Sequence, residues 1–531
     1  MIKNPILPGF NPDPSICRVG DDYYIATSTF EWYPGVQIHH SKDLVNWELV
    51  SRPLNRADQL DMRGNPDSGG IWAPCLSHAD GKFWLVYTDV KRLWGSSKDS
   101  HNYIVTCETI DGEWSERIFI NSSGFDPSLF HDDDGRKWFM NMQWNHRQKG
   151  TGVNQAHHRF NGTLLQEWSE EKGLFGPAVD IYAGTDLGLT EGPHIFKRNG
   201  YYYLTVAEGG TGYKHAVTMA RSRQIEGPYE THPDKHVITA KDASEHPIQR
   251  TGHGQYIDTP NGEFYHTFLM GRPLDGNFCP LGRETGIERC VWKDDDWLYL
   301  EHGSSLARQE IQLEGIEPHA PKVVEHEFKG QDLPIEFQWL RTPETERIFK
   351  SEATGLTLIG REMIGSWFEQ ALVARRQEHH SYSATTVTDF SPETYQHGAG
   401  LTTYYNQTKY HALLVTADEE LGRCLVIQSC PGNWPMGELE FLLDAPVAIP
   451  DGNIELRVEV DEKVQQFFWR MVGEQAWQPI GPSMDASVIS DEGGVGEHSS
   501  FTGAFVGMVA FDVNGHGKSA SFKRFGYYPE V

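Results

Sequence analysis

The sequence has few of the features that mark membrane or nucleic-acid-binding proteins. No run approaches the roughly 18 consecutive apolar residues that a membrane-spanning helix needs, so we predict no membrane partner. Lys and Arg number only 46 against 74 Asp and Glu, which leaves a formal net charge of −28. Such a surface repels phosphate backbones and argues against nucleic acid as a partner. It disfavours anionic ligands as well, and a neutral ligand such as a sugar fits best.

Cysteine is scarce too, with 7 residues scattered over a chain of 531 and no Cys-x-x-Cys pair. Neither a zinc site nor a disulfide framework is therefore expected, and the thiols are predicted to be reduced. No glycine-rich phosphate-binding motif marks a nucleotide site. The segment 1–5 lacks the basic and apolar stretches of a signal peptide, so we expect a cytoplasmic protein.

What the chain does have is length and aromatic side chains. Its 531 residues exceed the roughly 250–300 that one hydrophobic core serves, so two domains are expected. Hydrophobic residues make up 38% of the chain, and Phe, Trp and Tyr together 12%, which is typical of a globular protein rather than a disordered or fibrous one.

A turn glycine followed by aromatic residues recurs five times in the first 300 residues. Successive glycines lie 61, 54, 65 and 62 residues apart, and each leads into a segment rich in aromatic and β-branched residues. Five β-units of this length around one axis predict a five-bladed β-propeller. The glycines are Gly20, Gly81, Gly135, Gly200 and Gly262.

A proline or glycine stands 6–8 residues before each of these turns, at the expected start of an inner strand. Equivalent positions in equivalent blades lie at equivalent places about the axis. We therefore expect the residues one or two positions before each such proline or glycine to meet at one mouth of the propeller. These residues are Asp13, Trp72, Asp126, Glu191 and His253.

Three carboxylates that converge without metal-ligand spacing indicate acid–base chemistry. Hydrolysis of a glycosidic bond needs one protonated carboxyl group to protonate the leaving oxygen and one ionised carboxylate to act on water or carbon. A third carboxylate can raise the pKa of the acid by like-charge repulsion. Each Asp-Pro pair alone is more simply a turn signal, but three acidic residues in register with the repeat favour a site.

Long sequence blocks at these positions resemble a known family. Asn-Pro-Asp-Pro-Ser at 11–15, Gly-Phe-Asp-Pro-Ser at 124–128 and Thr-Glu-Gly-Pro-His at 190–194 resemble the signature blocks of glycoside hydrolase family 43. Further strings are similar to the two-domain β-xylosidases of that family, and the resemblance runs from about residue 4 to the C-terminus. These strings lie at 27–32, 70–74, 279–285 and 501–505.

The resemblance implies an inverting mechanism with assigned roles. Asp13 matches the general base that activates water, and Glu191 matches the general acid. Asp126 matches the residue that raises the pKa of Glu191 and orients it. Inversion needs carboxyl groups roughly 6.5–9.5 Å apart, so that a water fits between base and sugar. Arg283 resembles the arginine of the family's active site, where a guanidinium offsets the repulsion among carboxylates.

Further residues are expected to bind the substrate through the same resemblance. Phe30 and Trp72 look like walls of the subsite for the non-reducing xylose. His253 matches a histidine near the propeller axis, beneath the substrate. The mechanism implied needs no metal or organic cofactor, although a calcium ion held near His253 through waters stays open. The other matched pocket residues are Phe125, Trp144 and Thr211.

After residue 303 the repeat ends. A polar stretch at 304–322 is expected to link the propeller (1–303) to a second domain (323–531) whose dense alternating strands predict a β-sandwich of the jelly-roll, lectin-like kind. In the resembling enzymes this domain sends a phenylalanine into the active site. Phe501 is favoured for that position over Phe505, because Phe505 starts an alternating strand.

A phenylalanine closing one end of the site leaves room for one sugar, which predicts an exo-acting enzyme. The resemblance thus leads us to expect a β-xylosidase that releases xylose from xylo-oligosaccharides with inversion. The resemblance also implies side activity on α-L-arabinofuranosides and a homodimeric or homotetrameric assembly. Three alternatives remain. They are an enzyme acting mainly on arabinofuranosides or arabinan, a five-bladed fructan-cleaving enzyme that retains configuration, and a non-catalytic carbohydrate-binding propeller.

Overall fold

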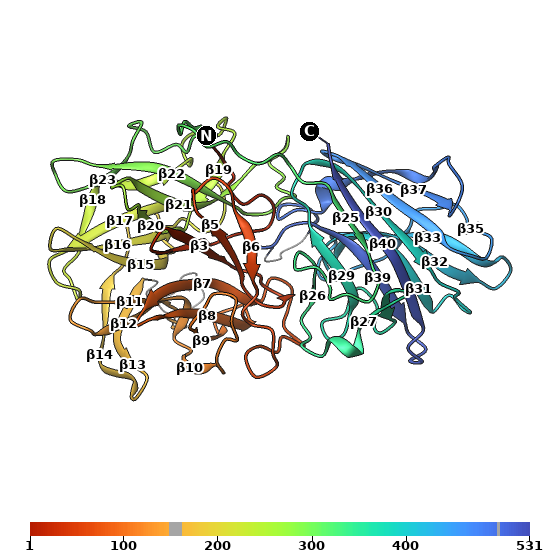
Figure 1. Cartoon of the computed structure of the whole chain (residues 1–531), viewed down its shortest axis with the longest axis horizontal. Coiled ribbons are helices and arrows are strands. Elements are labelled where there is room, and N and C mark those ends of the chain that lie inside the picture. The colour runs from red at the N-terminus through yellow and green to blue at the C-terminus, as the bar shows by residue number, and fades with distance from the viewer. Residues whose placement is uncertain (148–161, 496–499, 531) are drawn as a thin grey trace, which may run out of the picture.

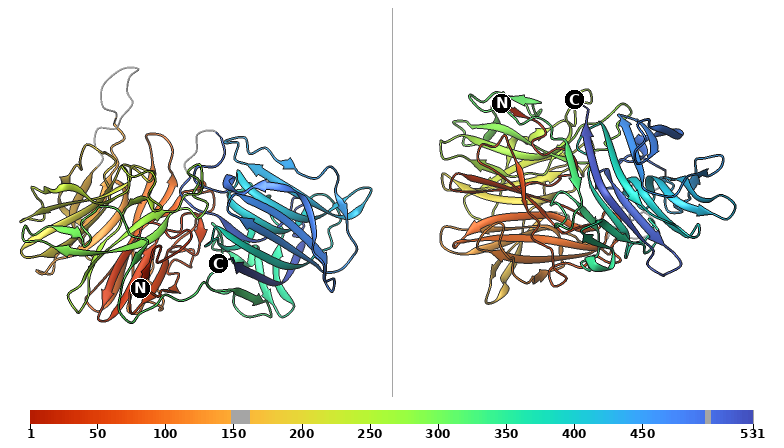
Figure 2. Two further views of the ribbon diagram at one scale, coloured as in Figure 1. Left: turned by 90° about the horizontal axis from the view of Figure 1, so that it is seen from above. Right: turned by 45° about the vertical axis from the view of Figure 1, so that its right-hand side comes forward.

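The computed structural model describes residues 1–147, 162–495 and 500–530 (Figure 1). Across these ranges the chain forms strands and two single-turn 3₁₀ helices, η1 (Thr345–Arg347) and η2 (Ala486–Val488), with no α-helix. None of the described helices is long and apolar enough to cross a membrane. A ring of small sheets and a pair of large sheets lie side by side in all three views (Figures 1 and 2). The predicted all-β fold, a five-bladed propeller followed by a sandwich, is confirmed.

The propeller consists of five antiparallel sheets, each made from one stretch of chain. The first blade contains β2 (Ser15–Val19), β3 (Asp22–Thr27), β5 (Gln37–Ser41) and β6 (Glu48–Ser51). The second contains β7 (Gly70–Ala79), β8 (Lys82–Arg92), β9 (Asp99–Cys107) and β10 (Ile118–Asn121). The third contains β11 (Gly124–His131), β12 (Lys137–Gln143), β13 (Thr163–Ser169) and β14 (Gly173–Tyr182). The fourth contains β15 (Glu191–Arg198), β16 (Tyr201–Glu208), β17 (Ala216–Ser222) and β18 (Glu230–Thr239). The fifth contains β19 (Gln249–Gly252), β20 (Tyr256–Asp258), β21 (Phe264–Gly271), β22 (Glu284–Trp292) and β23 (Leu298–Leu300).

The five glycines of the sequence repeat lie in the turns that join the inner strands of the blades to the next strands. Each has a positive φ, between 62° and 86°, which glycine adopts without the steric penalty that a side chain would bring. β2, β7, β11 and β15 are in contact from blade to blade, so the first strands of these four blades face the axis. Each repeat in the sequence therefore corresponds to one blade, and its glycine marks the turn after the inner strand.

The second body is a sandwich of two sheets whose facing side chains are buried. The smaller sheet has the order β27-β28-β40-β30-β36-β37-β38, with β25 paired to β40. The larger has the order β34-β33-β32-β31-β39-β29-β26-β4, with β35 paired to β33. The strands of the smaller sheet are β25 (Val324–Glu327), β27 (Phe349–Glu352), β28 (Gly355–Ile359), β30 (Ser381–Asp389), β36 (Ile454–Asp461), β37 (Val464–Met471), β38 (Gln478–Asp485) and β40 (Ser519–Pro529). Those of the larger sheet are β4 (Trp32–Tyr33), β26 (Gln338–Leu340), β29 (Ala371–Arg376), β31 (His397–Asn406), β32 (Lys409–Asp418), β33 (Gly422–Pro431), β34 (Glu440–Phe441), β35 (Val447–Ala448) and β39 (Phe505–Asp512).

The strand β4 belongs to the larger sheet of the sandwich although it lies within the first blade's stretch of chain. Trp32 pairs with Leu340, and Tyr33 pairs with Trp339. The polar connection expected at 304–322 also contains a short strand, β24 (Glu310–Ile311), which pairs with β1 (Ile2–Lys3). Both pairings tie distant parts of the chain together, and neither was foreseen from the sequence.

Candidate active site

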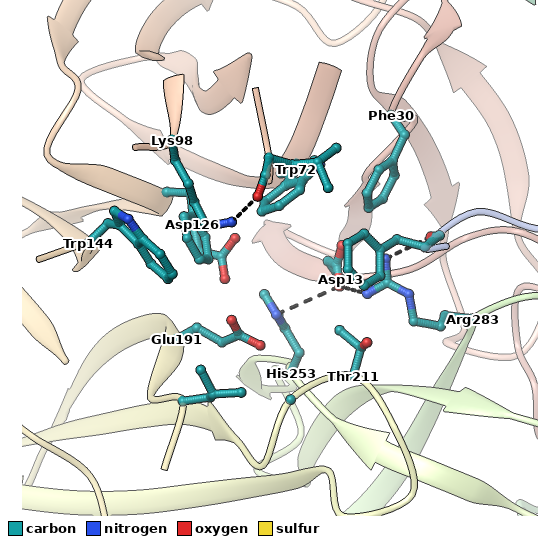
Figure 3. Close-up of a pocket in the computed structure, with 15 residues that line it drawn as sticks. Asp13, Phe30, Trp72, Lys98, Asp126, Trp144, Glu191, Thr211, His253 and Arg283 are labelled. Atoms are coloured by element: carbon teal, nitrogen blue, oxygen red, sulfur yellow. Dashed lines mark hydrogen bonds and ion pairs between the residues drawn. The ribbon is translucent and has the colours of Figure 1, made fainter. Parts of the chain in front are cut away.

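A cavity of about 320 Å³ lies where the inner strands of the propeller begin, and all eleven residues singled out from the sequence line it (Figure 3). The sequence reasoning missed four further lining residues, which are Leu93, Lys98, Leu189 and Gly210. The eleven are Asp13, Phe30, Trp72, Phe125, Asp126, Trp144, Glu191, Thr211, His253, Arg283 and Phe501.

Unusual backbone geometry turns the predicted side chains toward the axis. Asp13, Asp126 and His253 have φ values of 57°, 54° and 40°, in a region that non-glycine residues seldom adopt. Register shifts interrupt β7, β11, β15 and β19 near the same positions, and such bulges re-aim side chains. Gly192 takes φ 57° in the fourth blade, where a Cβ atom would lie 2.7 Å from the His253 ring. Backbone strain repeated from blade to blade indicates a site that the surrounding fold enforces.

The carboxylate of Asp13 is buried and held on both oxygens. Arg283 donates from Nη1 to Oδ1 over 2.9 Å, and the hydroxyl of Ser28 donates to Oδ2 over 2.7 Å. Nδ1 of His253 lies 3.7 Å from Oδ1. Burial alone would raise the pKa of Asp13, but Arg283, His253 and the Ser28 hydrogen bond together lower it below its usual value of 3.8. Asp13 is therefore ionised at neutral pH.

The pKa of Glu191 is shifted in the opposite direction, upward. Burial, and then the negative charge of Asp13, raise its pKa from 4.5 to about 7, against the opposing charges of Arg283 and Lys98. Burial and the carboxylates of Glu191 and Asp13 raise the pKa of Asp126 well above its usual value. Oδ2 of Asp126 accepts the backbone N–H of Gly192 over 3.1 Å, so Asp126 holds the residue that follows Glu191.

Aromatic rings form one wall of the cavity. Phe30 lies 6.0 Å from Trp72 between ring centroids, and Trp72 meets Phe125 edge to face at 5.1 Å. Phe125 lies 6.2 Å from Trp144. The indole N–H of Trp72 donates to the backbone oxygen of Ser68, which fixes the ring. Flat apolar faces of this kind suit the C–H surfaces of a sugar.

Phe501 reaches this wall from the sandwich. Its ring lies 6.3 Å from that of Phe30, its N–H donates to Oγ of Ser68 over 3.0 Å, and its carbonyl accepts from Arg283 over 2.9 Å. Phe505 is instead fully buried at the start of β39, where it stacks on Trp32 with centroids 3.6 Å apart. Of the two phenylalanines considered from the sequence, Phe501 is therefore the one that lines the cavity.

Lys98, one of the missed residues, lies over the aromatic wall. Its Nζ is 4.5 Å from the ring centroid of Trp144 and 6.0 Å from that of Trp72, and it donates to the backbone oxygen of Leu93. Burial lowers the pKa of Lys98 to about 8, although the carboxylate of Glu191 acts in the other direction. Lys98 stands outside the blade repeat, in a polar stretch between two strands, so nothing in the sequence pattern marked it.

His253 lies against the carboxylate of Asp13 and 6.3 Å from the ring of His194. Burial lowers the pKa of His253, so its ring is neutral. Calcium prefers six to eight oxygen ligands. No group of three or more His, Cys, Asp or Glu within the described ranges is arranged to hold a metal, so a calcium ion near His253 would take most of its ligands from water.

One ionised and one protonated carboxyl group beside an aromatic wall can serve as base and acid on a sugar acetal, so the site is that of a glycosidase. Two family models match the chain: Glycosyl hydrolases family 43 over residues 2–298, and Beta xylosidase C-terminal Concanavalin A-like domain over residues 325–528. The chain belongs to glycosyl hydrolases family 43. The resemblance noted in the sequence and the prediction of a glycosidase are thereby confirmed.

Relatives match the chain along its whole length. The Xylosidase/arabinosidase 43B of Humicola insolens is 56% identical over 534 residues, covering 99% of this chain and 98% of that protein. The Beta-xylosidase of Bacillus subtilis (strain 168) is 46% identical over 550 residues and 99% of both chains. The solved structure of xylan beta-1,4-xylosidase from Bacillus halodurans C-125 is 47% identical, with a TM-score of 0.95 over 99% of this chain and 100% of that one.

Proposed function

We propose that the protein is an exo-acting, inverting β-xylosidase that releases D-xylose from the non-reducing end of β-1,4-xylo-oligosaccharides. The observation that carries the proposal is the pair of opposed pKa shifts in one cavity, lowered at Asp13 and raised to about 7 at Glu191. At neutral pH these shifts supply a base and an acid at once. The names of the relatives support xylose as the sugar that is released.

In this mechanism Asp13 takes a proton from the attacking water while Glu191 gives its proton to the departing glycosidic oxygen. The water attacks the anomeric carbon from the face opposite the leaving group, so the configuration inverts. Arg283 keeps Asp13 ionised and fixes the orientation of its carboxylate. The carboxyl groups of base and acid are expected to lie roughly 6.5–9.5 Å apart.

We assign Asp126 the role of orienting Glu191 and raising its pKa. Its hydrogen bond to the N–H of Gly192 fixes the backbone next to Glu191. Two buried carboxyl groups close together disfavour double ionisation, which keeps protons on the pair as the pH rises. Asp126 thus acts on the acid through its position and through the repulsion that would arise if both groups were ionised.

The cavity supports the exo mode, and the names of the relatives support the choice of sugar. Phe30, Trp72 and Phe501 crowd one end of it, which supports a subsite for a single terminal sugar. Side activity on α-L-arabinofuranosides is included because xylose and arabinofuranose present similar hydroxyl groups, and because the Humicola insolens relative carries both names. An enzyme acting mainly on arabinofuranosides is the second candidate for the same reason.

The anomer of the first product tests the proposal. Xylobiose and a panel of 4-nitrophenyl glycosides are incubated with the enzyme, and the released sugar is followed by proton NMR before it mutarotates. We expect α-xylose to appear first and the β-xyloside to be the fastest of the panel. First release of β-xylose would contradict inversion, and faster cleavage of the α-L-arabinofuranoside would favour the second candidate.

We further propose that the reaction needs no metal, because the two carboxyl groups supply both the acid and the base. The same assay after dialysis against a chelator is expected to give an unchanged rate. A rate that falls and returns on adding calcium would instead support a calcium ion near His253. A homo-oligomeric assembly stays a prediction, which sedimentation analysis of the purified protein would check.

A further inference from the structure

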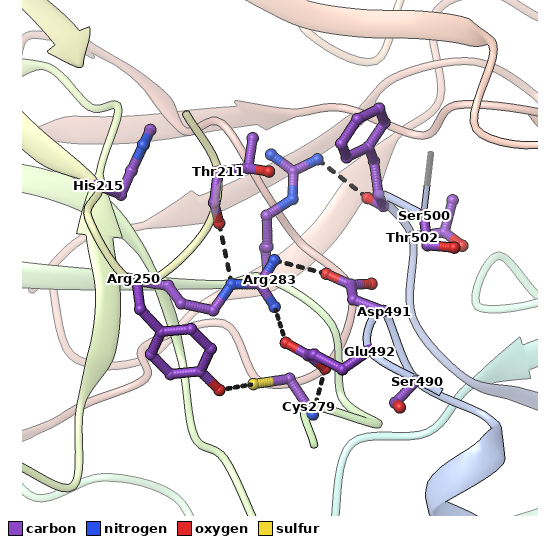
Figure 4. A network of polar contacts seen from close by, with 12 residues as sticks. Thr211, His215, Arg250, Cys279, Arg283, Ser490, Asp491, Glu492, Ser500 and Thr502 are labelled. Atoms are coloured by element: carbon purple, nitrogen blue, oxygen red, sulfur yellow. Dashed lines mark hydrogen bonds and ion pairs between the residues drawn. The ribbon is translucent and has the colours of Figure 1, made fainter. Parts of the chain in front are cut away.

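A buried network of polar contacts joins the fifth blade to the sandwich beside the cavity (Figure 4). At its centre is Arg250 on β19, which is 3% exposed and has a φ of 58°. Its Nη2 lies 2.7 Å from Oδ2 of Asp491, and its Nη1 lies 3.1 Å from Oε1 of Glu492. Its Nε donates to the backbone oxygen of Thr211 over 2.9 Å. One guanidinium therefore binds two residues of the sandwich and the backbone of Thr211, which lines the cavity.

The network continues from Asp491 to the backbone next to Phe501. The hydroxyl of Tyr405 donates to Oδ1 of Asp491, and its oxygen accepts the N–H of Thr502 over 3.0 Å. Tyr405 is fully buried, so neither contact is shared with bulk water. Two hydrogen bonds thus connect the carboxylate that Arg250 holds to the residue that follows Phe501.

The charges of the network balance inside the protein. Lys409 is fully buried, and its Nζ donates to the backbone oxygen of Ser490 over 2.8 Å and to Oγ of Ser500 over 3.1 Å. Lys409 and Arg250 supply two positive charges against the two carboxylates of Asp491 and Glu492. Because a buried charge is tolerated only when it is paired and hydrogen-bonded, Arg250 and Asp491 constrain each other's positions.

We propose that Arg250 and Asp491 are positioning residues for substrate binding, whose ion pair sets the place of Phe501 on one side of the cavity and of Thr211 on another. Both Phe501 and Thr211 line the cavity, whereas Arg250 and Asp491 do not. The inference rests on the proposed function, because it takes the cavity to be the sugar site.

Docking of the two domains does not depend on this ion pair. β4 lies within the larger sheet of the sandwich, and Arg341 of the sandwich pairs with Asp67 of the propeller at 2.7 Å. Loss of the Arg250–Asp491 contact should therefore leave the domains joined while it loosens Phe501 and Thr211. The expected effect is on sugar binding, since neither Arg250 nor Asp491 is bonded to the side chain of Asp13, Asp126 or Glu191.

The first test is Asp491→Asn, which keeps the shape of the side chain and removes its charge. A small displacement of the binding groups lowers the affinity for the sugar. We therefore expect KM to rise about tenfold, measured with the aryl glycoside that the wild type cleaves fastest. We expect kcat to change less than about twofold and the pH profile of kcat to keep its limb near pH 7. An unchanged KM, or a KM and kcat that fall together, would overturn the proposal.

Asp132→Asn is the matched control. Asp132 is also a buried carboxylate bonded to a cation and a tyrosine, since it accepts from Lys197 and Tyr202 at 2.8 Å each. It does not line the cavity, so KM is expected to stay unchanged. Tyr405→Phe is the milder second variant if Asp491→Asn does not fold, because it removes only the hydroxyl that links Asp491 to Thr502. We expect a smaller rise in KM from it.

A double-mutant cycle tests the route of the effect. If Asp491 acts through Phe501, the substitution Asp491→Asn should raise KM little further once Phe501→Ala is present. Effects that multiply would show that Phe501 does not carry the effect of Asp491 and would contradict that part of the proposal. Choosing the fastest aryl glycoside keeps this test valid even if xylose is the wrong sugar.

Hydrogen exchange of the backbone amides provides a readout that needs no activity. In Asp491→Asn, exchange should speed up at Phe501 and Thr502 and in the segment 209–213, but not in β12. The same exchange rates as the wild type at these positions would contradict the inference while leaving the proposed function untouched. Absence of any glycosidase activity in the wild type, with the exchange changed as expected, would instead contradict only the proposed function.

Discussion

At the scale of single residues, the site depends on giving two carboxyl groups unlike surroundings. Asp13 is bonded by Arg283 and Ser28, which favours its ionised form. Glu191 is buried near the negative charge of Asp13, which favours its protonated form. The strained φ of Asp13 brings its carboxylate to the axis, and Gly192, also at positive φ, directly follows Glu191. Backbone geometry and electrostatics therefore serve the same chemistry.

The substitution Glu191→Gln tests the acid. We expect kcat on xylobiose to fall about 10²–10⁴-fold, because the leaving sugar must then depart without a proton. An aryl xyloside with an acidic phenol as leaving group should be cleaved much closer to the wild-type rate. In the wild type, activity on xylobiose should be lost as pH rises through about 7, since Glu191 then gives up its proton. For the variant on the activated substrate, that limb should vanish from the pH–rate profile.

Asp13→Asn is the control for this prediction, since loss of the base is not relieved by a better leaving group. A Glu191→Gln variant that is equally slow on both substrates would count against the acid assignment. So would a wild-type profile whose alkaline limb persists unchanged in the variant.

At the scale of elements, the strand β4 makes the propeller and the sandwich depend on each other. Trp32 is fully buried, pairs with Leu340 and stacks on Phe505. Replacing it by alanine should lower the free energy of unfolding by about 3–5 kcal/mol, through lost burial and the cavity left behind. We expect calorimetry to show one transition for the whole chain, shifted to lower temperature. Phe119→Ala, at an exposed ring on β10, is the control and should change stability little.

Two separate transitions, with only one of them moved by Trp32→Ala, would show that the domains unfold independently. The expectation of a single transition would then fail, even if the loss of stability had the expected size.

The elements also show how far the sequence could predict this structure. The blades and the convergence of Asp13, Asp126 and Glu191 followed from a repeat, because each blade is a local unit whose turn and inner strand recur at fixed spacing. β4 has no such signal, since a two-residue strand whose partners stand 306 and 308 positions away leaves no local pattern. Lys98 was missed for a related reason, because it stands outside the repeat. Phe501 could be placed only through the family resemblance.

At the scale of the whole molecule, the cavity belongs to both domains together. Arg376 of the sandwich donates to the backbone oxygen of Phe10 over 2.6 Å, and Arg341 pairs with Asp67. Phe501 and Arg283 meet across the same boundary. The aromatic wall is therefore complete only when the sandwich is docked, although the three carboxyl groups all come from the propeller.

The net charge of −28 acts on any substrate that approaches this cavity. A neutral xylo-oligosaccharide is indifferent to that field, whereas one that carries a glucuronate on its reducing-end xylose is repelled. Charges farther apart than about 10 Å are screened at 0.1 M salt, so the repulsion should weaken as salt is added. We expect kcat/KM for the glucuronate-bearing xylotriose to rise about tenfold between low salt and 0.5 M sodium chloride. Under the same conditions kcat/KM for plain xylotriose, the matched control, should change less than about twofold. Equal salt dependence of the two substrates would show that the overall charge does not govern the approach to the site. A kcat/KM that falls with salt for the glucuronate-bearing substrate would instead indicate attraction by a local basic group such as Lys98.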